Sequence, residues 1–528
     1  MTKRLVVRKN RYFDSVFLMR IARQIADLPG IRDASSLMAT EANRRLLADL
    51  GYGIGGLERE LASAGPNDLV IAIEGEEAVV EAVAADLDKW LYREAAPGMA
   101  ADIMPRSLDE ALALRPDATV AVISVPGEYA AREARVALSR GLNVFLFSSN
   151  VSVDDELELK TQAREKGLIV MGPDCGTAYL CGAGLGFANA VRRGSIGIVG
   201  SSGTGMQEFV SLVHQAGCGI SHGIGTGSRD LLDVIGGLST LTAIEALEAD
   251  PATKVIALLS KPPGPATMAK VMQQLSACRK PVVMCLLGVG AEDMQVKPGS
   301  QARFAPTIDA AVGLAIGAAG GKLPARLRVD LASLEALAAE EVARMKPAQK
   351  WIRGIFAGGS FCYQSQAIIR EAGIEVHSNA PVPGAPALND PRMSFEHSLV
   401  DMGAEIFVEG RPHPMIDARL RRERVIREGG DPGIALLLLD FILGAVSSKD
   451  PVGDLLPAIE TAQAMVHEQG GYLCVAASVC GTDQDIQGLE EQAGKLRKAG
   501  VLVFPSNAQA ALFSQRLALL LWSGKKGR

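Results

Sequence analysis

Residues 194–217, GSIGIVGSSGTGMQEFVSLVHQAG, join a short run that is apolar on both faces to a glycine-rich turn and an amphipathic stretch. A run of this kind is typical of a parallel strand buried inside a sheet, and parallel strands need a long connection, usually a helix. The segment therefore predicts strand, turn and helix, the repeating unit of a doubly wound fold. The same order returns at 351–373, WIRGIFAGGSFCYQSQAIIREAG, so two domains of one architecture are expected.

The chain has 528 residues, more than a single hydrophobic core can serve. We expect a multidomain α/β protein with doubly wound parallel sheets and a small N-terminal α+β domain. The small domain is expected because RLVVRK and DLVIAIEG are strand-like and alternate with helical runs, as in a split βαβ sandwich. The predicted segments are an N-terminal domain at 1–98, parallel α/β domains at 99–190, 191–322 and 350–528, and a helical linker at 323–349.

Composition excludes several classes of function. The net charge of −6 provides no field that would attract nucleic acid or an anionic membrane. No uninterrupted apolar run reaches the roughly 20 residues that span a bilayer, and the N-terminus does not resemble a signal peptide, so a cytoplasmic protein is expected. The eight cysteines form no CxxC pair and the six histidines no HExxH, so neither a disulfide framework nor a metal site is predicted.

The first glycine turn has the chemistry of an anion site. The first four backbone N–H groups of a helix lack partners within it, and the helix dipole places about half a positive charge there. Glycines allow close approach of a phosphate, and hydroxyls add donors. The predicted phosphate-binding residues of this turn are Ser201, Ser202, Gly203, Thr204 and Gly205. An ordinary strand-to-helix turn with a Ser/Thr cap is the alternative, because neither the P-loop nor the GxGxxG spacing is present.

A second turn occupies the matching place in the last domain. Gly358, Gly359 and Ser360 follow the strand-like WIRGIF and precede a helical stretch. Two helix N-termini from similar domains could converge on one anion, and domain interfaces are common locations of small-molecule sites.

Several motifs together resemble the FdrA family of bacterial proteins, including its YahF-like branch. They are GPDCGTAYL (172–180), FANAVRRGSIGIVGSSGTGMQEF (187–209), GTGSRDL (225–231), SKPPGP (260–265) and GRPHPMID (410–417). The resemblance extends from YFDSVFLM (12–19) to the C-terminus. FdrA proteins are similar to ADP-forming acyl-CoA synthetases of the succinyl-CoA synthetase type. The resemblance to these synthetases implies a Rossmann-like domain at 99–190, a flavodoxin-like domain of the α-subunit type at 191–322 and a flavodoxin-like domain of the β-subunit type at 350–528.

The resemblance also implies a role for the turns. In the synthetases, two helix N-termini hold the phosphate of a phosphohistidine, and the matching positions here are 200–205 and 357–360. Yet residues 286–311, where that histidine is expected, contain none. Lys261 in SKPPG replaces the glutamate that orients the histidine, and no ATP-grasp domain is visible. This pattern indicates that phosphate enters attached to the substrate.

The family is associated with oxamate carbamoyltransferase, which interconverts oxalurate and phosphate with oxamate and carbamoyl phosphate and needs partner subunits. We therefore expect a carbamoyl or acyl phosphate transferase subunit in nitrogen catabolism that requires no cofactor. Its expected partners are the acyl phosphate, a carboxylate or amide substrate and other subunits, with self-association left open. The alternatives are an ADP-forming acyl-CoA synthetase, which would bind coenzyme A, and a non-catalytic metabolite-binding or scaffolding subunit.

Four residues are candidates for catalysis. Lys261 would stabilise developing negative charge, unless it is simply a solvated lysine at a strand end. Arg411 could bind a carboxylate through its two-pronged guanidinium, and His413 could move a proton, with Asp417 in the same patch. The alternative for GRPHPMID is a rigid turn whose His and Asp cap the following helix.

Three further residues border the expected cleft. Asp174 and Cys175 lie in a tight turn after a strand, where they would contact substrate or merely shape the pocket, and a nucleophilic cysteine would need a nearby base. Arg229 is a candidate contact for phosphate or carboxylate, whereas His222 is expected to be a satisfied polar residue.

Overall fold

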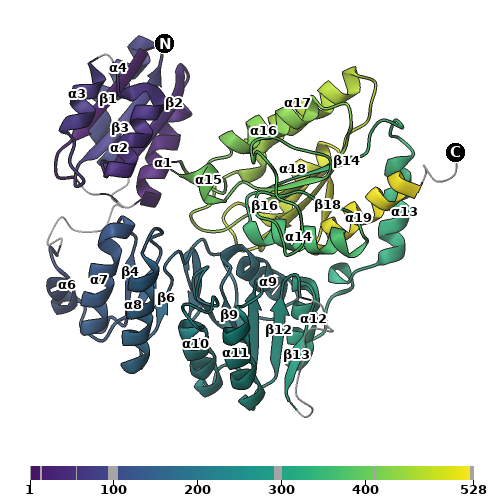
Figure 1. The fold of residues 1–528 in the computed structure, drawn as a ribbon, viewed down its shortest axis with the longest axis horizontal. Helices are drawn as coiled ribbons and strands as arrows, with labels where there is room; N and C mark the ends of the chain where they lie inside the picture. Colours follow the sequence, from purple (N-terminus) through teal and green to yellow (C-terminus); the bar gives the residue numbers. More distant parts are fainter. Residues whose placement is uncertain are drawn as a thin grey trace. The chain divides into compact units, whose positions relative to one another are not determined.

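The computed structural model describes residues 2–11, 13, 15–54, 56–92, 105–289, 300–409 and 411–523. The chain forms two units, the first built from residues 1–118 with 405–417 and the second from 119–404 with 418–528. Figure 1 labels many of the helices and strands of both. We describe each unit by itself.

The first unit is built on an antiparallel sheet in the order β1-β3-β2. The central strand β3 is buried on both faces, since Ile71 and Ile73 belong to one apolar core and Val70 and Ala72 to another. The expected small α+β domain is therefore present. The elements of the first unit are β1 (Thr2–Arg8), α1 (Ser15–Ala26), β2 (Ile31–Met38), α2 (Glu41–Leu47), the π-helical turn η1 (Ala48–Tyr52), α3 (Leu57–Ser63), β3 (Leu69–Gly75), α4 (Glu77–Ala85), α5 (Leu87–Tyr92), α6 (Leu108–Leu114) and α15 (Glu405–Val408).

The second unit contains three sheets among its described residues. The smallest is parallel, in the order β4-β5-β6, and is covered by α7 and α8. It supports the parallel α/β arrangement expected after the N-terminal domain. Its elements are β4 (Val120–Ile123), α7 (Gly127–Ser139), β5 (Asn143–Leu146), α8 (Val153–Glu165) and β6 (Val170–Met171).

The largest sheet has the order β13-β12-β11-β9-β10-β7-β8 and is parallel from β13 to β10. The hairpin β7–β8 adds antiparallel strands at the β10 edge, so residues 177–186 extend this sheet rather than the preceding one. Its elements are β7 (Thr177–Leu180), β8 (Ala183–Gly186), β9 (Arg193–Gly200), α9 (Gly203–Gln215), β10 (Ile220–Gly225), α10 (Leu238–Ala249), β11 (Val255–Ser260), α11 (Pro265–Ala277), β12 (Val282–Leu286), β13 (Ala302–Phe304) and α12 (Ile308–Ala318).

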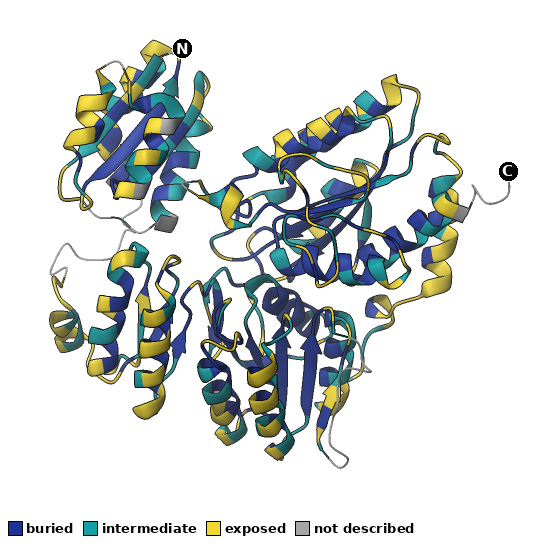
Figure 2. Ribbon diagram, in the orientation of Figure 1, coloured by how far each residue is buried: buried dark blue, intermediate teal, exposed yellow. Residues whose placement is uncertain are grey.

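Alternation along the strands explains why this sheet is covered on both faces. In β11, Val255, Ala257 and Leu259 pack in the core under α9 and α12, whereas Ile256 and Leu258 pack under α10 and α11. Successive side chains of a strand point to opposite faces, so an all-apolar strand needs helices on both sides. Figure 2 shows the result, buried strands between helices that are exposed only on their outer faces.

The third sheet of this unit is also parallel, in the order β15-β14-β16-β17-β18. Helices α14 and α19 pack together beside it, and α16 packs on α17. The doubly wound fold predicted for both large domains is confirmed. The elements are β14 (Trp351–Phe356), α14 (Gly359–Glu371), β15 (Ser398–Asp401), α16 (Arg419–Gly429), β16 (Ile434–Ile442), α17 (Pro451–Glu468), β17 (Cys474–Cys480), α18 (Leu489–Lys498), β18 (Leu502–Phe504) and α19 (Asn507–Ser523).

The two large sheets are joined by a helical connection and meet through helices. The connection contains the short 3-10 helix η3 (Ala325–Leu327) and α13 (Leu331–Val342), and α13 packs along α19. Helix α9 of the seven-stranded sheet contacts α14 of the five-stranded sheet. No helix in the described part of the chain is both long and apolar enough to cross a membrane.

A buried ion cluster ties α8 to the seven-stranded domain. The ammonium group of Lys160 has no exposed surface and donates to Glu156 Oε1 (2.8 Å), Asp230 Oδ1 (2.8 Å) and the Thr226 carbonyl (2.9 Å). Asp230 also caps α10 by accepting from the backbone N–H groups of Ser239 and Thr240. Every charge in the cluster is therefore hydrogen-bonded.

Replacing Lys160 with methionine should destabilise this domain by about 3–5 kcal/mol, because two buried carboxylates would lose their cation. Urea denaturation followed by circular dichroism would measure the loss. Arg164→Ala on the same helix is the matched control, since it removes a half-exposed ion pair with Glu245 and should cost less than about 1 kcal/mol. Equal effects of the two variants would contradict the structural role of the cluster.

Candidate functional site

The two glycine turns face each other in the second unit. The first follows β9 and opens α9, and the second follows β14 and opens α14. The hydroxyl groups of Ser202 and Ser360 are hydrogen-bonded across the gap. A Cβ atom added at Gly205 would lie only 3.4 Å from Cβ of Ser360, so the two helix starts are in direct contact. The structure thus brings together the residues predicted to bind phosphate, and anion binding itself stays a prediction.

The facing turns retain unused hydrogen-bond donors. Ser202 is the N-cap of α9 and accepts from the backbone N–H of Gly205, while the Ser201 hydroxyl bonds to that of Ser260 (2.7 Å). This is the Ser/Thr cap that the alternative interpretation expected. Donors nevertheless remain, because five backbone N–H groups in the turns have no hydrogen-bond partner among the described residues. They belong to Ser202, Gly203, Thr204, Gly359 and Ser360.

A buried carboxylate occupies part of the second turn. Asp440, in β16, accepts from the backbone N–H groups of Ala357 (2.8 Å) and Gly358 (2.7 Å). Arg421 donates to Asp440 Oδ1 (2.8 Å) and to the Ile355 carbonyl (2.9 Å). Burial raises the pKa of Asp440, and the charge of Arg421 opposes that rise. Asp440 and Arg421 therefore hold the turn in place and leave only its last two N–H groups for a ligand.

A second carboxylate lies over the start of α14. Asp401, the last residue of β15, accepts from the Gly403 backbone N–H (2.9 Å). A Cβ atom added at Gly359 would lie 2.7 Å from Asp401 Oδ2, so only glycine leaves room for the carboxylate there. Burial raises the pKa of Asp401 to about 6, and the nearby charge of Lys261 opposes the rise. The site therefore holds an acid that can titrate close to neutral pH.

Lys261 directly follows β11, whose last residue, Ser260, contacts the first turn. Its ammonium nitrogen lies 5.2 Å from the centre of the Tyr363 ring in α14, a distance at which a cation interacts with an aromatic face. This lysine consequently belongs to the same group of residues as the two turns and Asp401.

The described residues 411–417 of the GRPHPMID motif are part of the first unit. Segment 405–417 belongs to the first unit, whereas Lys261 and both turns belong to the second. His413 forms a tight turn, with its carbonyl accepting from the Ile416 and Asp417 backbone N–H groups and its Nδ1 from that of Met415. The Arg23 side chain also donates to the Ile416 carbonyl. These contacts form the rigid turn of the alternative interpretation, whereas the capping of the following helix by His413 and Asp417 is not among them and stays a prediction.

The remaining candidates have structural contacts. Asp174 adopts a positive φ of 56° and accepts from the Ser228 hydroxyl (3.1 Å). Cys175 is buried, and burial raises the pKa of its thiol to about 12, which disfavours a nucleophilic thiolate. Arg229 donates to Glu156 Oε2 (2.9 Å) and to the Val151 carbonyl (2.7 Å). Their role as substrate contacts remains a prediction.

The sequence analysis did not identify Asp401, Asp440, Arg421 or Tyr363. Both aspartates carry a recognisable signal, because each appears near the end of an apolar run, SLVD and ALLLLD. Carboxyl ends of parallel strands form the usual ligand-binding edge of a doubly wound sheet, so an acid at that position is a site candidate. Arg421 and Tyr363 lie on helical stretches without a comparable signal.

Family models match three parts of the chain. Residues 193–315 match the succinyl-CoA ligase like flavodoxin domain, and residues 355–517 match CoA-ligase. Residues 1–103 match a model described as AllF, heavy metal-associated domain. The first two matches agree with the two doubly wound domains that carry the facing turns.

Known proteins are similar over the whole chain or part of it. YahF of Escherichia coli (strain K12) is 43% identical over 517 residues, covering 98% of each chain. The alpha subunit of ADP-forming succinate–CoA ligase from Methanothermobacter thermautotrophicus is 29% identical over 180 residues, which are 33% of this chain and 59% of that subunit.

Solved structures that match the chain include ATP citrate lyase from Methanothrix soehngenii in complex with citrate and coenzyme A. It has 16% identity and a TM-score of 0.35, and the match covers 80% of this chain and 86% of that one. A dinucleotide-forming acetyl-coenzyme A synthetase from Ca. Korarchaeum cryptofilum has 17% identity and a TM-score of 0.28, with coverage of 78% and 85%.

The N-terminal segment does not fit the metal that its family description mentions. Heavy-metal sites prefer thiolate and imidazole ligands. Residues 1–103 contain neither cysteine nor histidine, and no cluster of at least three metal-binding side chains occurs among the described residues. The match therefore concerns the fold of the segment, and we assign it no metal.

Asp401→Asn should reveal the raised pKa as a pH-dependent gain in stability. Ionising Asp401 is unfavourable in the folded chain, so the parent protein loses stability as pH rises from about 4 to about 6 and then levels off. The variant lacks this loss, so its free energy of unfolding relative to that of the parent should increase by about 2–3 kcal/mol between about pH 4 and about pH 6. Urea denaturation would measure the difference.

Asp330→Asn provides a control of opposite sign. Its hydrogen bonds with Ser333 lower the pKa of Asp330, so the parent gains stability from this group as pH rises through its ordinary titration range. The free energy of unfolding of the Asp330→Asn variant should therefore fall relative to that of the parent protein as pH increases. A pH-independent difference for Asp401→Asn would contradict the raised pKa.

Proposed function

The chain belongs to the family of the Escherichia coli protein YahF, and we propose that it transfers an acyl group to or from a phosphate held between turns 201–205 and 357–360. The observation that carries the proposal is the contact between two helix N-termini with five unused backbone N–H groups among the described residues. Such groups bind phosphate because their dipoles and donors favour an anion.

The absence of a histidine favours phosphate that arrives free or on the substrate. Residues 286–311 contain no histidine, although the family resemblance places a phosphohistidine there in the synthetases. A retained pair of phosphate-binding turns without a phosphocarrier suits a reaction in which phosphate is itself a reactant.

Carbamoyl phosphate is the substrate that we propose. In the direction of its synthesis, a phosphate oxygen would add to the ureido carbonyl carbon of oxalurate, the C–N bond would break, and the departing nitrogen of oxamate would take a proton. Lys261 would stabilise the negative charge that develops on the carbonyl oxygen. Asp401, with its pKa raised to about 6, would supply the proton. Partner subunits are part of this proposal.

Acid–thiol ligation is a second candidate. It is favoured by the CoA-ligase match at 355–517 and by the similarity to a succinate–CoA ligase subunit. This activity would use coenzyme A as a substrate and would need a phosphoryl carrier other than a histidine at 286–311.

Calorimetric titration with phosphate, carbamoyl phosphate and coenzyme A would separate the two candidates. We expect both phosphate and carbamoyl phosphate to bind. Gly359→Ala should weaken their affinity by about tenfold or more, because the added methyl group would collide with Asp401 at the edge of the turn. Gly494→Ala in α18 is the matched control, since its methyl group would enter open space. Binding of coenzyme A without either phosphate would contradict carbamoyl transfer and support ligation.

A further inference from the structure

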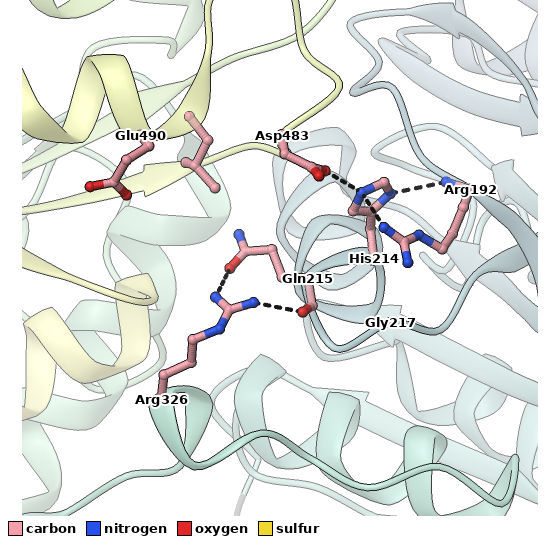
Figure 3. Close-up of a pocket in the computed structure, with 8 residues that line it drawn as sticks. Arg192, His214, Gln215, Gly217, Arg326, Asp483 and Glu490 are labelled. Carbon is pink, nitrogen blue, oxygen red and sulfur yellow. Dashed lines mark hydrogen bonds and ion pairs between the residues drawn. The ribbon is translucent and has the colours of Figure 1, made fainter.

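A cavity of about 280 Å³ lies where four segments of the second unit meet. They are the residue before β9, the end of α9, the connection near η3, and the loop after β17 with the start of α18. Figure 3 shows the polar side chains that line it. They are Arg192, His214, Gln215, Arg326, Asp483 and Glu490. The cavity is separate from the glycine turns, because α9 begins at the first turn and reaches the cavity with its last residues, roughly 20 Å away at 1.5 Å per residue.

The hydrogen bonds of His214 leave Arg192 without an acceptor. The ring is 1% exposed, and its Nδ1 accepts from the Arg192 backbone N–H (3.0 Å), so a neutral ring carries its hydrogen on Nε2. Nε2 lies 2.6 Å from Asp483 Oδ1, to which it donates, and 3.1 Å from a guanidinium nitrogen of Arg192. One N–H cannot also accept, so His214 gives the guanidinium of the exposed Arg192 no acceptor, and its donors stay available to a ligand.

The second arginine also lacks a carboxylate. Arg326 donates to the side-chain oxygen (3.2 Å) and the backbone carbonyl (2.7 Å) of Gln215, both neutral groups. Neither Arg192 nor Arg326 forms an ion pair with a carboxylate among the described residues. The acids of the cavity are already engaged, Asp483 by His214 and Glu490 by Arg497.

The Asp483 carboxylate that lines the cavity is held by the histidine rather than by either arginine. The hydrogen bond from His214, together with the charge of Arg192, lowers the pKa of Asp483, so that this carboxylate stays ionised and bonded to the histidine. Both arginines line the cavity and neither is paired with a carboxylate of the described residues, so each guanidinium has donors that can bind carboxylate or phosphate oxygens in pairs.

We propose that this cavity binds a small organic dianion, either a dicarboxylate or a phosphate monoester, through Arg192 and Arg326. The ligand would contact the ends of both large domains and the connection between them. It would therefore bind at the far end of the helix whose first residues form the candidate phosphate site, as an effector rather than as a substrate of that site.

Arginine modification by phenylglyoxal, read peptide by peptide in a mass spectrometer, would test the proposal on the full-length chain. Succinate represents dicarboxylates, AMP represents phosphate monoesters, and inorganic phosphate is the third probe. At a probe concentration about ten times its Kd, modification of Arg192 and Arg326 should slow by roughly tenfold. The glycine turns contain no arginine, so binding there cannot produce this signal.

Arg193 is the internal control, because it is exposed and adjacent to Arg192 but does not line the cavity. Protection of Arg192 and Arg326 by succinate alone would identify a dicarboxylate, and protection by AMP or phosphate would identify a phosphate ligand. In Arg326→Ala, Arg192 should lose its protection if the two residues share one ligand. Equal protection of Arg193, or no protection by any probe at millimolar concentration, would overturn the proposal.

Discussion

A buried polar seam between the two large domains determines where the glycine turns lie. Glu208 of α9 accepts from the backbone N–H of Asn507 (2.6 Å), and Gln364 of α14 donates to the side chain of Asn507 (2.9 Å) while accepting from the Ile308 N–H (2.9 Å). Asp309 of α12 bonds to the Ser506 hydroxyl. Burial raises the pKa values of Glu208 and Asp309. Because unpaired polar groups are costly in such an interior, the helices have little freedom to slide, and the turns at their ends stay opposed.

Patterns within single segments could be predicted from the sequence, whereas pairings across the chain could not. All-apolar strands followed by glycine turns predicted both doubly wound domains, and the matching turns predicted that two helix N-termini would meet. The hairpin β7–β8 was not identified, because its pairing with β10 depends on tertiary contact. Arg421 was missed for the same reason, since nothing in a helical, charged stretch indicates which arginine will be buried against Asp440.

The two carboxylates at the second turn limit the ligands that it can accept. Asp440 already uses two N–H groups and is balanced by Arg421, whereas the described residues place no comparable ion-pair partner on Asp401. An ionised Asp401 would repel an anion that approaches Gly359 and Ser360. A protonated Asp401 would instead donate a hydrogen bond to that anion. If the paired turns bind phosphate as proposed, the protonation state of this one buried acid would control whether they repel or hold it.

The helical connection around α13 has a consequence for how the paired turns assemble. In a synthetase whose corresponding domains lie on separate subunits, opposing the two turns requires association of two chains. Here both domains belong to one polypeptide, and α13 packs along α19 between them. Pairing of the turns is thus an intramolecular event, governed by an effective concentration set by the connection and not by the amount of protein. Each molecule carries a complete pair of turns, however dilute the solution.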